Sequence, residues 1–478
     1  MADGGNRRTV AIIILLYILI AFGIILFIIT KYREKNSRCN VLNSIATEDN
    51  KNDIKKITGG IVNKTDNKTP DMIEDGKADT KIFLHSLVNY HVKSAYNCCA
   101  VKSFRNSFVS SCALRNCLKL GVRCLDFEIY SVGNKAVVGA SSKDLNINTK
   151  ETFNDIDFAD VLKIINDEGF DNNNTLQYFE NNDSKDSILD FPIILHLRIK
   201  TKNRRAYDNM AESLFNVLGD KLMDSDYSIL NQVKTWGNDN WETDEAEPTK
   251  IGMENNLIFA PMIKNNQRPA EGSDDTNQHE LNDTFRRKVI VIFNIKTIIP
   301  SASTNNYGYE EFLNLTKESS GDTQYGNIVN YINLISPSPD CNTIRNFDVE
   351  NATDLQKAEI KDEAKYRLMI SIPTIASAST NYNYANHLNL GIQMPCLSFQ
   401  NLRNSSSVIK CAEASDAARE KEDCNTYILK YLKHFNKNGG AYFKRDDMAF
   451  ILTMYSEVSA TTVANYSQTS AIYNDVQI

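Results

Sequence analysis

Two acidic side chains stand two residues apart near the end of a predicted β-strand at residues 121–130. Apolar residues alternate there with Arg123, Asp126 and Glu128, and residues i and i+2 of a strand point to the same face. Paired carboxylates at a strand end are typical of a metal site or of acid–base catalysis. The alternative is a pair of solvated acids on a strand edge, and this stretch alone does not choose between the two.

The composition restricts the class of protein. The chain has 478 residues, 42% of them hydrophobic, and a formal net charge of -7. This length and apolar content suit a folded core rather than a disordered chain, and the acidic balance argues against a nucleic-acid partner. The ten cysteines are too few for a disulfide scaffold, and they show no paired zinc-ligand spacing. They leave the redox compartment open.

Residues 10–30 form an uncharged run rich in Ile, Leu, Ala and Phe, which is the length needed to cross the ~30 Å hydrocarbon layer as a helix. A cleaved signal peptide fits less well, because the run exceeds about 15 residues and no small-x-small site follows it. We expect a tail at residues 1–9 and a single-pass membrane anchor, Val10 to Thr30, which makes the membrane a partner.

The side of the membrane is harder to predict. Two arginines precede the span and four basic residues follow it: Arg7, Arg8, Lys31, Arg33, Lys35 and Arg38. The positive-inside tendency therefore favours a cytosolic position for the rest of the chain. Asn-X-Ser/Thr sequons such as the one at Asn314 would indicate the opposite side, but an Asn-rich chain contains them by chance. Residues 31–80, rich in Asn, Asp, Lys and Thr, predict a polar stalk.

Strand and helix patterns alternate from about residue 81, which predicts a parallel α/β architecture. The predicted strands are 83–94, 121–130, 135–138, 191–199, 288–294, 367–372, 391–400 and 441–444. The predicted helices are 105–120, 158–165, 206–222, 328–334 and 426–436. Residues 221–285 carry more acid than base and no sustained periodicity, so we interpret them as an acidic linker. Eight strands in two sets of four around this linker suit a closed (β/α)8 barrel.

Several short motifs resemble, in order, the X and Y halves of the catalytic barrel of eukaryotic phosphoinositide-specific phospholipase C. The X-half matches are residues 96–97, 121–128, 191–195 and 214–220, and the Y-half matches are residues 380–383, 391–394, 397–400 and 438–442. The resemblance implies a TIM barrel of the phospholipase C-like phosphodiesterase type. Its X half would be residues 81–220, its X/Y linker residues 221–285 and its Y half residues 286–450, with a C-terminal tail at residues 451–478.

The resemblance also implies where a catalytic site would lie. The family cleaves a phosphodiester in a lipid headgroup with two histidines and a calcium ion. The position of the first histidine is Tyr96 and that of the second is Gly139. Because a tyrosine with a pKa near 10 is a poor proton shuttle at pH 7, we assign no catalytic residue.

The implied calcium ligands are kept only in part. The family's asparagine and its first two acids fall on Asn97, Asp126 and Glu128, whereas its further glutamate falls on Arg198. Calcium takes six to eight oxygens, usually with several negative charges, and a guanidinium would oppose it. We therefore expect a vestigial calcium site in which Arg198 bridges the two carboxylates. We expect no cofactor, or calcium if the protein is active.

The implied substrate-binding residues are also missing. The family's arginine and tyrosine for the inositol phosphates fall in the apolar run 368–373, and the lysines after its fifth strand fall near Ile292, with Lys296 close by. We assign no substrate-binding residue.

Three functional hypotheses follow. The first is a membrane-anchored, catalytically inactive phospholipase C-like protein with a structural, scaffolding or binding role. The second is an active phosphoric diester hydrolase of altered mechanism, in which Asp126 and Glu128 act with His196 as base. His196 lies inside an apolar strand, where a packed core histidine is the more common case. The third is a module whose barrel mouth binds a phosphoinositide headgroup or a protein partner without turnover.

Overall fold

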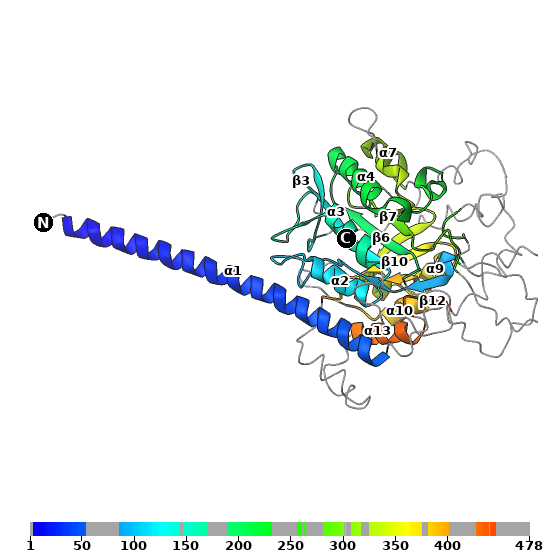
Figure 1. The fold of residues 1–478 in the computed structure, drawn as a ribbon, viewed down its shortest axis with the longest axis horizontal. Helices are drawn as coiled ribbons and strands as arrows, with labels where there is room; N and C mark the ends of the chain where they lie inside the picture. Colours follow the sequence, from blue (N-terminus) through cyan, green and yellow to red (C-terminus); the bar gives the residue numbers. More distant parts are fainter. Residues whose placement is uncertain are drawn as a thin grey trace, which may run out of the picture.

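A long helix, α1 (Asp3–Asp53), projects from a mixed α/β body in the computed structural model (Figure 1). The structure describes residues 3–53, 86–143, 147–170, 189–231, 256–260, 262, 281–300, 302, 307–316, 325–374, 381–400, 427–438 and 440–445. The predicted stalk beyond residue 53, most of the predicted linker and the predicted tail at 451–478 lie outside these residues.

The largest sheet runs in the order β5-β4-β3-β6-β7-β8, with β2 beside β3. Its strands are β2 (Ser94–Ala95), β3 (Cys124–Val132), β4 (Lys135–Gly139), β5 (Ile156–Asp157), β6 (Ile193–Ile199), β7 (Val289–Asn294) and β8 (Leu334–Ser336). The pairs from β2 through β3, β6 and β7 to β8 are parallel, whereas β4 returns antiparallel along β3 as a hairpin. Every residue of β6 and β7 is buried, as expected for parallel strands covered on both faces.

A second parallel set consists of β9 (Cys341–Arg345), β10 (Leu368–Ile372) and β11 (Met394–Pro395). A parallel bridge between Ala95 and Leu397 joins this set to β2. On the other side, the hydroxyl oxygens of Ser336 and Thr343 lie 2.8 Å apart and connect β8 with β9. The two sets form a TIM-barrel-like body, called the barrel below. A separate antiparallel pair is made by β1 (Tyr90–Val92) and β12 (Tyr442–Lys444).

The strands of the barrel are not the eight that we predicted. The predicted strands at 135–138 and 441–444 exist, but both pair antiparallel and lie outside the parallel sets. In their place the barrel contains β8 and β9, which the sequence patterns do not predict. The predicted helix at 328–334 is a single 3-10 turn, η6 (Ile328–Asn330), followed by β8. Strands as short as β8 carry too few residues for an apolar period to be recognised.

Helices pack around the barrel (Figure 1). They are α2 (Ser111–Lys119), α3 (Phe158–Glu168), α4 (Arg204–Leu218), α7 (Tyr309–Thr316), α8 (Asn346–Asn351), α9 (Asp354–Glu363), α10 (Tyr384–Asn389) and α13 (Tyr427–Lys437). Three further 3-10 turns are η3 (Leu87–Asn89), η4 (Gly219–Lys221) and η5 (Ser225–Tyr227). Ser110 caps α2 by accepting from the amide of Cys112, which satisfies one of the free amides of the first turn. The buried face of α3, with Val161 and Ile165, belongs to the main core.

The described part of the predicted acidic linker is not a solvated connection. Leu257, Ile258, Met262, Leu281 and Phe285 are buried in the same apolar cluster as residues of β10 and β12. These short apolar segments lie inside a region whose average composition is polar. A prediction from average composition therefore places them in a linker.

Helix α1 differs from the predicted anchor and stalk in its length. Its segment Thr9–Ser37 is long and apolar enough to cross a membrane, and it is the one such helix among the described residues. The helix then continues to Asp53, where we expected a polar stalk. Residues of α1 after position 30 contact the barrel. Packing of this kind stabilises a helix more than its intrinsic propensity does.

Candidate functional site

The two acids of β3 face a histidine and an arginine on β6. Asp126 is in register with His196, and Glu128 with Arg198. Because alternate residues of a strand share a face, these four side chains and Asn97, which follows β2, point into one region. All five are buried, with Asp126 fully buried and Arg198 only 3% exposed. We call this group the arginine cluster.

The guanidinium of Arg198 is the centre of the cluster. Its Nε and Nη2 donate to the two carboxylate oxygens of Asp126, both at 2.9 Å. Its Nη1 donates to Oε1 of Glu128 at 2.6 Å, and Nη2 also donates to Oδ1 of Asn97 at 2.9 Å. The bidentate pairing with Asp126 is the strongest geometry available to an arginine–carboxylate pair. The prediction that Arg198 bridges Asp126 and Glu128 is confirmed.

The two carboxylates also accept hydrogen bonds from groups other than Arg198. Oε2 of Glu128 accepts from the hydroxyl of Tyr130 at 2.6 Å and from the amide of Ser141 at 2.8 Å. Oδ1 of Asp126 accepts from the amide of Asn97 at 2.9 Å. Hydrogen bonds of this kind compensate two carboxylates for the loss of water.

His196 joins the cluster from the far side of Asp126. Its Nδ1 lies 2.8 Å from Oδ2 of Asp126, and its Nε2 lies 3.1 Å from Oγ1 of Thr343 on β9. Both ring nitrogens are therefore engaged inside the barrel. The sequence favours a core histidine here, with a base acting beside Asp126 as the alternative, and it does not predict the bond to Thr343. The signal in the sequence is that His196 precedes Arg198 by two residues, so that both side chains lie on the same face of the strand.

The charges of the cluster support one another. Burial by itself raises the pKa of Asp126, but the Arg198 charge and the hydrogen bond with His196 outweigh it and hold that pKa well below its usual range. Burial opposes the charge on Arg198, yet Asp126 and Glu128 raise the pKa of the guanidinium well above normal. Two carboxylates and one guanidinium leave a formal charge of -1, from -1 - 1 + 1.

The residues present do not fit a calcium ion. The guanidinium lies among the oxygens of Asn97, Asp126 and Glu128 that would be the ligands, and it donates to all three. A cation added there would meet a buried positive charge at contact distance. Among the described residues, no group of three or more His, Cys, Asp or Glu side chains could hold a metal ion.

The positions of the two family histidines are filled in different ways. Tyr96 is buried, and the centroid of its ring lies 4.3 Å from Cζ of Arg198, a cation–π contact. Burial raises the pKa of Tyr96 further above 10. Gly139 ends β4 opposite Glu128, and a Cβ added there would lie 3.0 Å from Cδ of Lys150. An imidazole at residue 139 would need this lysine to move.

The positions implied for substrate binding offer no charged group to the cluster. The run 368–372 is strand β10 and is wholly buried, while Lys296 is exposed beyond the end of β7. The segment that follows β4 instead folds back onto the barrel: the amide of Asn148 donates to the carbonyl of Lys200 at 2.6 Å, and that of Glu151 to the carbonyl of Ala140 at 2.9 Å.

A comparison with protein families matches part of the chain. The family model "Phosphatidylinositol-specific phospholipase C, X domain" matches residues 84–236. No curated protein sequence matches the chain. Among solved structures, the chain is similar to PLC21 of L. pealei and to PLC21 of S. officinalis, each at 13% identity and a TM-score of 0.44 over 77% of this chain and 38% of the other. The chain thus spans 38% of the length of these two proteins. On the X-domain match, the chain is phospholipase C-like, with a TIM-barrel-like fold.

Proposed function

We propose that the protein is a membrane-anchored, phospholipase C-like protein without catalytic activity, which serves a structural, scaffolding or binding role. The observation that carries the proposal is the position of Arg198, whose guanidinium donates to Asn97, Asp126 and Glu128 together. A filled and charge-compensated centre has no open coordination position and no free carboxylate to offer a substrate.

Among the described residues of the cluster and its surroundings, neither Tyr96 nor His196 is suited to acid–base chemistry. A general base must reach the proton that it abstracts and must have a pKa near the working pH. Tyr96 is buried against Arg198 with a raised pKa. His196 is fully buried, with its two nitrogens at hydrogen-bond distance from Asp126 and Thr343. The family reaction therefore has neither of its proton carriers here.

The apolar segment Thr9–Ser37 supports the membrane-anchored part of the proposal, and contacts between α1 and the barrel indicate which surface would face the bilayer. The rings of Phe27, inside the apolar segment, and Phe153 lie 6.3 Å apart, and those of Tyr32 and Phe108 lie 5.2 Å apart. Phe153 is 47% exposed. If α1 spans a bilayer, Phe27 lies near the edge of the hydrocarbon layer, so these loops of the barrel lie at the membrane surface.

One observation favours the second hypothesis, an active hydrolase of altered mechanism. The 2.8 Å contact between His196 and Asp126 is the geometry of a histidine base oriented by a carboxylate. In such an enzyme His196 would have to exchange its bond with Thr343 for one to the substrate. The third hypothesis, binding of an inositol phosphate headgroup without turnover, requires a cationic surface rather than the cluster itself.

Full-length protein in phosphoinositide vesicles with millimolar calcium tests these alternatives. We expect no inositol phosphate release above the rate of protein-free vesicles, in an assay where an active phospholipase C serves as positive control. Release that His196→Asn abolishes would establish the altered mechanism and refute the pseudoenzyme. Calorimetric titration of the same protein with soluble inositol phosphates separates a binding role from a structural one.

A further inference from the structure

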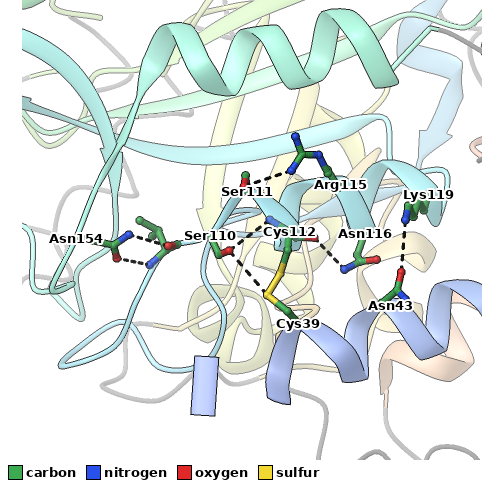
Figure 2. The surroundings of a disulfide bond; sticks show 10 residues. Cys39, Asn43, Ser110, Ser111, Cys112, Arg115, Asn116, Lys119 and Asn154 are labelled. Atoms are coloured by element: carbon green, nitrogen blue, oxygen red, sulfur yellow. Dashed lines mark hydrogen bonds between the residues drawn. A yellow bond between two sulfur atoms is a disulfide. The ribbon is translucent and has the colours of Figure 1, made fainter. Parts of the chain in front are cut away.

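Helix α1 is attached to the barrel by a disulfide bond. Cys39 of α1 and Cys112 in the first turn of α2 are bonded, with their Cα atoms 6.0 Å apart and 73 positions apart in sequence (Figure 2). This separation lies within the range of about 4.4–6.8 Å that a disulfide requires. Both residues are half-buried at the surface.

Contacts on both sides of the bond form an interface between α1 and the barrel. Lys119 of α2 donates to Asn43 of α1 at 3.4 Å, on the C-terminal side of the bond (Figure 2). On its N-terminal side, Lys35 lies over the ring of Phe108 at 5.7 Å, and Lys102 forms an ion pair with Glu34. Polar and aromatic contacts on both sides of Cys39 thus hold the two thiols in reach of each other.

The other described cysteines differ from this pair. Cys98, Cys99, Cys117, Cys124, Cys341 and Cys396 are free and buried. Burial raises the pKa of the Cys98 and Cys99 thiols, which makes them unreactive. Among the described residues, Cys39 and Cys112 are the pair that a disulfide joins.

We propose that Cys39–Cys112 is a structural disulfide that fixes the barrel to the anchor helix, and that the barrel lies on the oxidising side of the membrane. The S–S bond forms as two S–H bonds break, and a donor disulfide of the compartment takes up the two electrons and two protons to become a dithiol. Glutathione and thioredoxin keep surface disulfides reduced in most cytosols. The choice of side rests on the proposed membrane anchor, whereas the tether itself does not.

This placement opposes the bias of the flanking charges. Four basic residues follow the span and two precede it, which favours a cytosolic barrel. One of the four, Lys31, is paired with Glu34 at 3.3 Å. Long domains are also translocated largely regardless of flanking charge. A covalent bond that needs an oxidant is the stronger indicator of the two.

Gel-shift labelling of the full-length protein in its native membranes tests the tether. Denatured protein is treated with polyethylene glycol-maleimide with and without prior reduction. We expect reduction to add two labels that depend on this pair, so that Cys39→Ser and Cys112→Ser each lose the two-label difference. The control Cys341→Ser, a buried free cysteine of β9, keeps it. Labelling of Cys39 and Cys112 without reduction would overturn the tether.

Protease protection in sealed microsomes tests the side. We expect the barrel to be protected until detergent is added and Asn351, an exposed sequon position, to be open to glycosylation. Digestion of the barrel without detergent would overturn the assignment to the oxidising side even if the disulfide is present. Extraction at alkaline pH separates the two proposals, because release of the chain from the membrane would refute the anchor while the label count still decides the tether.

Discussion

Replacing Arg198 by methionine should be the most damaging single change to the arginine cluster. The substitution keeps apolar bulk beside Tyr96 but leaves Asp126 and Glu128 buried without a counter-charge. Removing one partner of a buried ion pair costs about 3–5 kcal/mol. Arg198 makes four hydrogen bonds to three partners, so we expect a loss near the upper end of that range. This is a large part of the ~5–15 kcal/mol that stabilises a typical domain.

The matched control is Arg115→Met, which breaks the 2.6 Å ion pair with Glu168 on the surface. The Arg115 side chain is 45% exposed, and such pairs contribute about 0–1 kcal/mol. Guanidinium unfolding of the full-length protein in detergent micelles, followed by far-UV circular dichroism, gives both free energies from the transition midpoint and slope.

A triple variant separates charge from packing. Asp126→Asn and Glu128→Gln, combined with Arg198→Met, remove the uncompensated charges while keeping the shape of the cluster. We expect the triple variant to be more stable than Arg198→Met alone, because two neutral amides cost less to bury than two carboxylates. If Arg198→Met costs no more than the surface control, or if the triple variant recovers nothing, our account of the cluster is wrong.

Four other outcomes can be checked with the same protein. The pKa of Asp126 in the folded protein lies below its value near 3.9 in the unfolded chain. The stability that Asp126 contributes is therefore complete above about pH 4 and is lost as the pH falls below this value. Acid titration of Asp126→Asn should show a shallower loss of stability in that range. Burial lowers the pKa of His387 to about 3, so below about pH 6.5 the unfolded chain binds a proton that the folded chain does not. The free energy of unfolding should therefore fall as the pH decreases from about 6.5. An unchanged dependence of this free energy on pH in His387→Gln would contradict the prediction. Arg198→Glu should bind calcium in calorimetric titration where the wild type does not, and equal heats for both proteins would refute the proposed steric and charge block. With the native tryptophans replaced, a tryptophan substituted for Phe153 should be quenched by brominated lipids, whereas one substituted for Phe215, an exposed residue of α4, should not. Equal quenching would exclude a barrel surface fixed at the bilayer.

The sequence alone determined the local features of this protein. An uncharged run of 21 residues at 10–30 predicts the part of α1 that is long and apolar enough to cross a membrane, because length and hydropathy are read from the sequence without reference to the fold. The two-residue spacing of Asp126 and Glu128 placed both carboxylates on one strand face. The resemblance to the phospholipase C family, rather than the spacing, placed Arg198 beside them, and a buried arginine requires partners of opposite charge.

The tertiary structure decided which distant groups complete these features. Thr343 meets His196 across 147 positions of sequence, and β8 and β9 enter the barrel although neither shows a readable period. Cys39 pairs with Cys112 because α1 continues past the predicted span and lies along α2. Periodicity and spacing record short-range geometry, whereas register, strand closure and helix docking depend on surfaces that come together only in the folded chain. For that reason the sequence located the carboxylates, and the fold decided the hydrogen bonds that Arg198 and His196 make to them.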